Sequence, residues 1–345
     1  MRNFKSLAPQ RTSRIDAAPC WKGCLGLALL LLLTGCARLQ VKMGMKVPLA
    51  QIPVASMDAS LPKGPGIAPG GKSPLVVTVT GANGKVYATE GAGHGKIMWQ
   101  DLKVTATVVN VDKKGIVTLA HDPRKSEGQV PHITVTAPSH PSVHAELDVP
   151  LRYDSKFVAN FSGASGSSGM NGTDGTSGFS GSPGSTDPNN PSPGGDGSDG
   201  TDGSNGGDGG DGGNAPAVQV QVALRAGSHP LLQVSVSPSV GHKKLFLVDP
   251  QGGSLTVVAN GGEGGSGGRG GSGGRGGSGG FGSPNGSDGR SGSDGRSGSD
   301  GSPGRGGSIT VTYDPQTKPF LTVIHLSNTY GPPPVFVEEK VGPLW

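Results

Sequence analysis

Gly261-Gly-Glu-Gly-Gly-Ser-Gly-Gly-Arg269 carries the pattern that decides the fold of this chain, because glycine returns at every third residue. Glycine continues in this register to position 282 and, after one inserted residue, from 286 to 304. An earlier tract has the same form, with glycine at every third position from 163 to 184 and from 194 to 212. Each tract therefore consists of eight triplets, an interruption and seven triplets. A random flexible linker has no reason to show this form twice.

The period of three predicts a threefold helix that rises about 3.1 Å per residue, so that eight triplets span about 74 Å. A collagen triple helix is one interpretation, and it requires three parallel chains and hence a homotrimer. Proline stabilises that structure, but here it occupies the third triplet position only at Pro183, Pro284 and Pro303. Solvated disorder is a second interpretation, because the tracts are rich in glycine and poor in apolar residues.

The third interpretation, which we favour, is a polyglycine II hairpin within one chain. Each tract runs out for eight triplets, turns at 185–193 or near Asn285, and returns for seven. Triplets in 261–280 and 206–214 hold two glycines, so these stretches have two bare faces and suit inner positions, where backbones approach closely and exchange hydrogen bonds. The arrangement resembles the glycine-rich helix bundles of certain antifreeze proteins and phage adhesins.

The composition limits what else can fold. The chain has 345 residues, of which 64 are glycine and 29 proline, and aromatic residues make up only 4%. Conventional cores must therefore be small, and the strand-like segments outside the tracts predict an all-β protein without significant α-helix after the N-terminal leader. A net charge of +4 is too small to indicate a nucleic-acid partner.

The N-terminus predicts export. Basic residues precede a leucine-rich run, Leu25 to Leu33, which is about half the ~20 residues that a membrane-spanning helix needs. The run ends in Leu33-Thr34-Gly35-Cys36, which resembles a bacterial lipobox. This resemblance implies a signal peptide at 1–35, lipidation of Cys36 and attachment to the bacterial outer membrane or cell surface. Cys36 is then the only cysteine of the mature chain, so no internal disulfide is expected.

Three regions follow the predicted anchor. Residues 36–72 contain five prolines and predict an extended tether, with an early edge strand near 41–47. Residues 73–153 contain short strand-like segments, among them 96–99, separated by Gly, Pro, Asp and Asn. Their pattern resembles the immunoglobulin-like β-sandwiches of bacterial surface proteins, with Trp99 as a large core residue.

Residues 154–345 predict a second β-domain that carries the tracts 163–214 and 261–308. Similar strands precede the two tracts, and each tract is followed by two strand-like segments with a turn between them. We therefore expect an internal repeat of strand, tract and β-hairpin, in which Ile309–Thr312 and Phe320–Ile324 form the second hairpin. The tracts become insertions between neighbouring strands of one sheet system.

No catalytic, cofactor or metal site is predicted. His140 and His144 are four residues apart, but Pro141 argues against the helix that would bring them together. The Arg-Gly-Gly motifs in the second tract resemble RNA-binding segments, yet export removes RNA as a partner. The first tract is acidic and the second carries arginines, so either mutual attraction or a solubilising surface is expected.

We therefore expect a lipid-anchored structural or adhesive protein of the cell surface that is not an enzyme. The alternative is an ice- or polysaccharide-binding module built on the same glycine bundle. Expected partners are the membrane, through the lipid on Cys36, and surface polysaccharide or other cell-surface proteins. A monomer is expected, or a homotrimer if the tracts form collagen.

Overall fold

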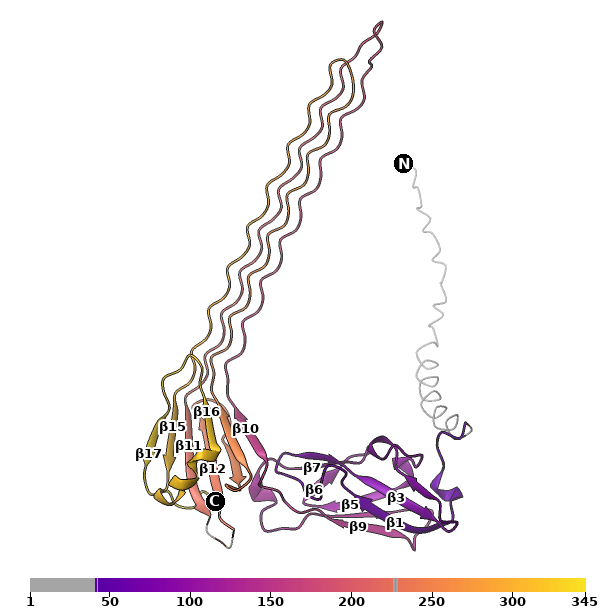
Figure 1. Ribbon diagram of the computed structural model, residues 1–345, viewed down its shortest axis with the longest axis vertical. Coiled ribbons are helices and arrows are strands. Elements are labelled where there is room, and N and C mark those ends of the chain that lie inside the picture. The colour runs from indigo at the N-terminus through magenta and orange to yellow at the C-terminus, as the bar shows by residue number, and fades with distance from the viewer. Residues whose placement is uncertain (1–40, 42, 226, 228) are drawn as a thin grey trace, which may run out of the picture. The chain divides into compact units, whose positions relative to one another are not determined.

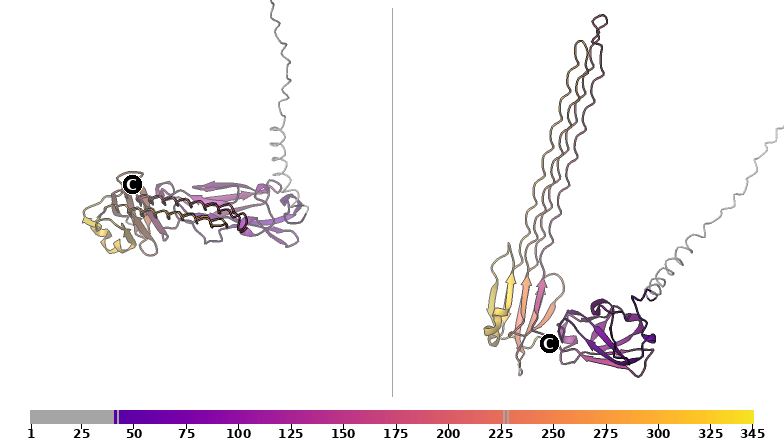
Figure 2. Two further views of the ribbon diagram at one scale, coloured as in Figure 1. Left: turned by 90° about the horizontal axis from the view of Figure 1, so that it is seen from above. Right: turned by 45° about the vertical axis from the view of Figure 1, so that its right-hand side comes forward.

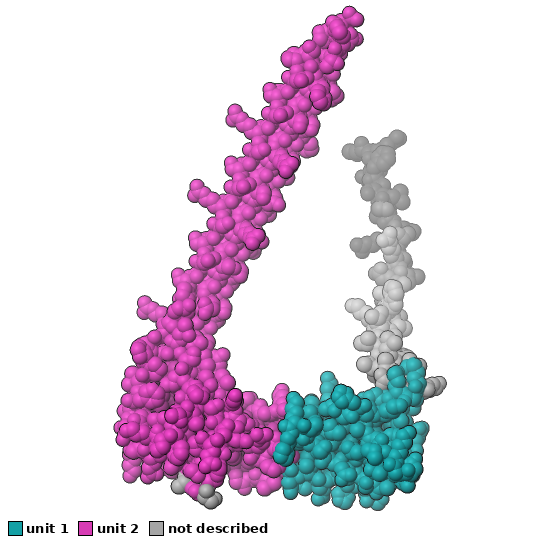
Figure 3. Space-filling view, viewed as in Figure 1, with its two compact units in different colours: residues 1–65, 73–117, 132–148 teal, residues 66–72, 118–131, 149–345 magenta. Residues whose placement is uncertain are grey.

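The computed structural model describes residues 41, 43–225, 227 and 229–345. Its elements are 17 β-strands and five 3-10 helices, so the prediction of an all-β protein with almost no helix is confirmed for this part of the chain (Figure 1). The chain divides into two compact units (Figure 3). Unit 1 comprises Met1–Pro65, Ser73–Val117 and His132–Asp148, and unit 2 comprises Gly66–Lys72, Thr118–Pro131 and Val149–Trp345.

Unit 1 is built from antiparallel strands. One sheet has the order β1 (Val54–Ser60), β3 (Val76–Gly81) and β4 (Val86–Ala88), and another has the order β5 (Lys103–Thr107), β8 (His132–Thr136) and β9 (His144–Asp148). A further three-stranded sheet of the chain, which does not fall within unit 1 alone, has the order β2 (Lys72–Pro74), β7 (Ile116–Leu119) and β6 (Val109–Val111). A short 3-10 helix at Leu49–Gln51 precedes β1, and two others, at Gly91–Gly93 and Trp99–Asp101, lie between β4 and β5 in the chain.

Three expectations for this region need correction. The described residues of 41–47 contain no strand, and the first strand is β1. Residues 54–60 lie in the range expected to be a tether, but they form β1 and pair antiparallel with β3, because Met57 turns into the core while its neighbours stay outside. Residues 96–99 form no strand, since only Ile97 makes a bridge, to Thr89, and the chain then turns into the 3-10 helix that begins at Trp99. Trp99 itself is buried, as expected.

Unit 2 contains two sheets whose repeated strands run parallel. The first has the order β10 (Lys156–Asn160), β14 (Ser254–Val258) and β16 (Ile324–Ser327). The second has the order β13 (Lys244–Val248), β12 (Leu231–Pro238), β11 (Val218–Arg225), β15 (Ile309–Tyr313) and β17 (Val335–Glu338). Within it, β11, β15 and β17 are parallel, and β12 and β13 add antiparallel strands beside β11.

The two sheets of unit 2 share one apolar core. It contains side chains of β10, β14 and β16 from the first sheet and of β11, β12, β13 and β15 from the second. Valine and leucine at alternate positions supply most of it, as in β11, where Val218, Val220 and Val222 are fully or almost fully buried. Face-to-face packing therefore follows from the period-two pattern of these strands.

The predicted internal repeat exists in a different form. Each tract crosses from one sheet to the other, from β10 to β11 and from β14 to β15, and does not join neighbours within a sheet. The second hairpin does not form, because Pro315–Val323 is a 3-10 helix capped by the side chain of Asp314 and containing Pro319. The chain then continues as β16, beside β14, and crosses to β17 through the short connection 328–334. The crossing thus occurs three times, twice with a glycine tract.

We predict that Leu255→Ala, which removes a fully buried side chain of β14, lowers the free energy of unfolding by about 2–5 kcal/mol. Val158→Ala is the matched control on the adjacent strand β10, where the side chain is 60% exposed, and it should change stability by no more than about 0.5 kcal/mol. Urea denaturation followed by circular dichroism measures both. Equal effects of the two substitutions would contradict the shared core.

Candidate functional site

The glycine tracts form four extended segments that lie side by side and rise from the ends of the strands of unit 2 (Figure 2). We call them segment I (163–184), segment II (194–214), segment III (261–282) and segment IV (286–305), and together the glycine bundle. Segments I and II are joined by the turn 185–193, in which Ser185 and Ser192 bridge, and segments III and IV by a shorter turn.

The sheets set the register of the bundle. β10 pairs parallel with β14 so that Lys156 lies beside Ser254, 98 residues later, and segments I and III continue this pairing with the same separation, as in the bond from the Ser272 amide to Asp174. β11 pairs parallel with β15 so that Val218 lies beside Ile309, 91 residues later, and this separation recurs between segments II and IV. The two sheets thus align the segments before the tracts begin.

Backbone hydrogen bonds link the segments at every third residue. Glycine amides of segment I donate to segment III, and those of segment II donate to segment IV, both in parallel orientation. Amides of segment II also donate to segment I, those of segment III to segment II, and those of segment IV to segment III, all antiparallel. Typical distances are 2.7–2.9 Å, as for Gly169 to Ser266 at 2.8 Å. Segments II and III therefore bond with three neighbours each, and segments I and IV with two.

Close approach, and not backbone conformation, explains the glycines. None of the glycines in the bundle has a positive φ. A Cβ atom built on Gly268 would overlap the carbonyl oxygen of Met170, and one on Gly267 would overlap that of Gly298. The second-position glycines of segment III are buried along its length, as expected for a segment with two bare faces. Any larger residue in these rows would force two segments apart.

Aspartate and asparagine side chains supply a second set of bonds. Every third-position side chain of segment II accepts a hydrogen bond from a backbone amide of segment IV at 2.6–2.8 Å. These acceptors are Asp196, Asp199, Asp202, Asn205, Asp208, Asp211 and Asn214. The acidic row is therefore part of the structure, where the sequence suggested charge attraction or solubility.

Side chains also accept hydrogen bonds from backbone amides at two other contacts between segments. Asn171 and Asp174 of segment I accept from amides of segment III. Asp288, Asp294 and Asp300 of segment IV accept from glycine amides of segment III at 2.7–2.8 Å. Among the described residues, no ion pair joins an aspartate of the first tract to an arginine of the second. The carboxylates act as acceptors for amides that the backbone alone leaves without partners.

The third crossing closes the base of the bundle. The carbonyl oxygens of Thr329 and Tyr330 accept from the amides of Gly261 and Gly306, each at 3.1 Å. The side chain of Asn328 donates to the carbonyl of Gly307 at 3.1 Å, and Asn260 accepts from the amide of Thr329 at 2.8 Å. The short connection therefore satisfies the first amide of segment III and polar groups of the two residues that follow segment IV.

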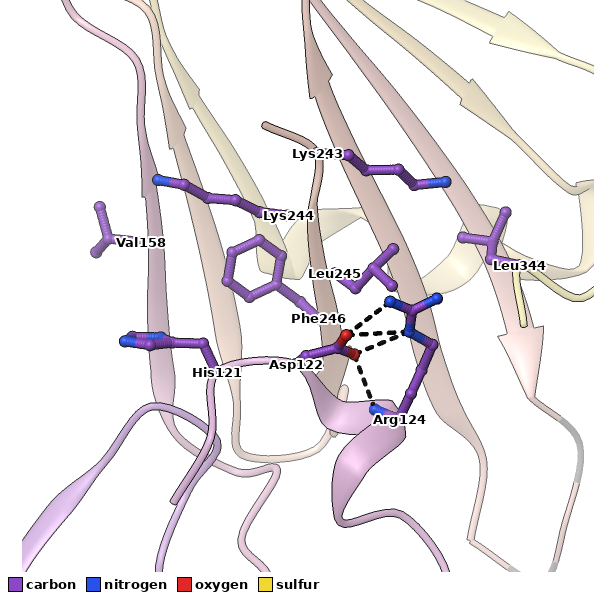
Figure 4. Close-up of a pocket in the computed structure, with 9 residues that line it drawn as sticks. All are labelled: His121, Asp122, Arg124, Val158, Lys243, Lys244, Leu245, Phe246 and Leu344. Atoms are coloured by element: carbon purple, nitrogen blue, oxygen red, sulfur yellow. Dashed lines mark hydrogen bonds and ion pairs between the residues drawn. The ribbon is translucent and has the colours of Figure 1, made fainter. Parts of the chain in front are cut away.

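Unit 2 also contains a pocket of about 430 Å³ beside β13 (Figure 4). Lys243, Lys244 and Phe246 of this strand region line it, together with the Asp122–Arg124 pair. Hydrogen bonds from the Arg124 side chain hold the pKa of Asp122 below its ordinary value, so this pair neutralises itself. His121, Val158, Leu245 and Leu344 complete its lining.

The residues predicted from the lipobox, Leu33, Thr34, Gly35 and Cys36, lie outside the described residues. In the part of the chain that the structure describes, no group of three or more histidine, cysteine, aspartate or glutamate side chains is arranged to hold a metal ion. None of the helices within the same residues has the length and apolar character that crossing a bilayer requires.

No protein-family model matches the chain, and no curated protein matches its sequence.

We predict that Gly268→Ala lowers the free energy of unfolding by about 1–3 kcal/mol, because its methyl group cannot fit against the carbonyl of Met170. Gly207→Ala is the control, since a Cβ there would lie 3.3 Å from its nearest neighbour and the same row accepts Ser204. That variant should stay within about 0.5 kcal/mol of the wild type. Thermal unfolding followed by circular dichroism compares them, and tolerance of both substitutions would contradict the close approach.

We predict that Asp202→Ala speeds hydrogen exchange at the Ser293 amide roughly fivefold, the effect of losing about 1 kcal/mol of hydrogen bonding. Asp202→Asn should keep slow exchange, because Asn205 and Asn214 already fill the same role in this row. Amide exchange measured by nuclear magnetic resonance distinguishes the two variants. Fast exchange in both variants would mean that the negative charge of Asp202, and not its hydrogen-bond acceptor, slows exchange at the Ser293 amide.

Proposed function

We propose that the protein is a lipid-anchored structural or adhesive protein of the bacterial cell surface and presents the glycine bundle as its working part. The observation that carries this proposal is the continuous hydrogen-bonding of four segments over their whole length, which suits a stiff rod and leaves no enclosed reaction site in it. At a rise of about 3.1 Å per residue, segment I extends about 65 Å.

In this proposal the four segments are threefold helices of the polyglycine II type, paired as two hairpins. Hydrogen bonds that recur at every third residue support this, because three residues make one turn of such a helix. Unit 1 then serves as an immunoglobulin-like spacer between anchor and rod, a role consistent with its antiparallel sheets. The chain acts by display and not by catalysis.

The proposed anchor is Cys36, which becomes the lipidated first residue of the chain once the leader is cleaved behind the lipobox residues Leu33, Thr34 and Gly35. Several acyl chains on one cysteine give stable attachment, where a single chain gives only marginal binding. The partners are then the membrane and, at the exposed rod, surface polysaccharide or another surface protein.

We predict that Cys36→Ala abolishes membrane attachment of the full-length chain expressed in a bacterium with an outer membrane. Wild-type protein should sediment with the outer membrane, incorporate labelled palmitate and increase attachment of the cells to a surface. Cys24→Ala is the matched control, because Cys24 lies in the segment that cleavage should remove, and it should behave as wild type. Membrane retention of the Cys36 variant would contradict the proposal.

A further inference from the structure

The perimeter of the glycine bundle has four edges, each formed by two segments that hydrogen-bond to one another. Three edges carry charge. Segment III contributes Arg269 and Arg275 opposite segment I, segment IV contributes Arg290 and Arg296 opposite segment II, and aspartates of segment IV lie against segment III. The fourth edge, between segments I and II, differs. Its second-position residues, from Ala164 to Ser182 and from Gly195 to Gly213, include no charged residue.

Hydroxyl groups face each other at the centre of this uncharged edge. The Thr173 hydroxyl lies 3.1 Å from that of Ser204, and the Thr176 hydroxyl lies 3.1 Å from that of Thr201. All four side chains are exposed. Ser204 and Thr201 also accept from the backbone amides of Thr173 and Thr176, so each pair keeps one hydroxyl hydrogen and its remaining lone pairs for a ligand. Successive triplets are about 9.3 Å apart at the expected rise, so the pairs form a short ladder along the rod.

Two large apolar side chains flank the hydroxyl ladder. Phe179 is 84% exposed and lies opposite Ser198, whose hydroxyl accepts from the Phe179 amide at 2.7 Å. Met170 is 80% exposed and lies opposite Gly207, whose amide donates to the Met170 carbonyl at 2.8 Å. Nine residues separate the two, or about 28 Å at the same rise. Nothing in the bundle requires an aromatic ring or a thioether at these positions, since neither packs into a core.

We propose that the uncharged edge between segments I and II binds a neutral polysaccharide laid along the rod. This inference rests on the proposed surface function and names the ligand class and the face. Sugar hydroxyls match the ladder, and the apolar face of a sugar ring matches the exposed ring of Phe179. A charged polysaccharide gains no ion pair on this edge and loses hydration there.

Two other occupants fit this edge less well. An ice surface requires a flat face, and this edge carries two large exposed side chains, Phe179 and Met170, in the same row as the threonines of segment I. A second copy of the chain requires roughly 800 Å² of complementary surface from each partner, with an apolar centre. This edge is only two segments wide, and its centre consists of hydroxyl groups.

The test is cosedimentation of the purified full-length chain with insoluble neutral polysaccharides (cellulose, chitin and a β-1,3-glucan) and with an acidic one, alginic acid. We expect binding to at least one neutral polysaccharide that survives high salt, and a roughly tenfold loss of affinity in Phe179→Ala, the effect of removing one stacked ring. Phe281→Ala is the matched control, because Phe281 is 80% exposed on segment III, away from this edge. Both variants should unfold at the wild-type temperature.

Several results would overturn the inference. These are equal binding by the Phe179 and Phe281 variants, binding to the acidic polysaccharide alone, and thermal hysteresis or Phe179-dependent self-association without glycan binding. If Phe179→Ala leaves glycan binding intact while cells carrying the chain still attach to surfaces, the inference fails and the proposed function stands. Membrane retention of Cys36→Ala overturns the proposed function whatever the glycan result.

Discussion

The backbone hydrogen bond between extended segments, made at every third residue, is the interaction on which the rest of the bundle depends. It holds two segments so close that a Cβ atom in the contact row would overlap a carbonyl oxygen of the neighbouring segment. Glycine is therefore required there by space. Its large ordering entropy has to be offset by many such bonds. Segment III, with glycine in two rows, is the clearest case, because it lies between three neighbours. The remaining positions point outward and can carry acceptors, hydroxyls or an aromatic ring.

The two sheets of unit 2 set the register of the four glycine segments relative to one another. A period of three allows many registers, each shifted by one triplet, and backbone bonds alone discriminate weakly among them. Parallel pairing of β10 with β14 and of β11 with β15 sets the separations of 98 and 91 residues, which the bundle then keeps. The aspartate row of segment II reinforces one of these registers. The connection 328–334 closes the base without a tract of its own.

Composition and period predict much of this architecture. Alternating valines predict β-strands, and the two-glycine triplets of 261–280 coincide with a segment that has three neighbours. Other features depend on partners distant in sequence. From the sequence, Asp202 resembles a solvated surface charge, but in the structure its side chain accepts a hydrogen bond from the Ser293 amide. The flanking strands do not reveal the crossing between sheets, because similar strands are also compatible with a hairpin. The segment expected as the second strand of that hairpin is instead largely part of a 3-10 helix that contains Pro315 and Pro319. Residues 54–60 contain too few apolar residues to stand out as a strand, yet β3 pairs with them.

The four edges of the glycine bundle differ in the side chains that they expose. Aspartates and asparagines accept hydrogen bonds from backbone amides at three edges, and serine and threonine hydroxyls of segment II do so at the fourth. The fourth edge also carries the exposed side chains of Phe179 and Met170, which make no packing contribution to the bundle. All of this depends on the four segments being folded together in a single chain. Residue-resolved hydrogen exchange of the full-length protein tests that most directly. The structure predicts slow exchange at the bonded glycine amides of segments I to IV, in a pattern that repeats every three residues and is independent of protein concentration. Uniformly fast exchange across 163–214 and 261–305 would contradict it.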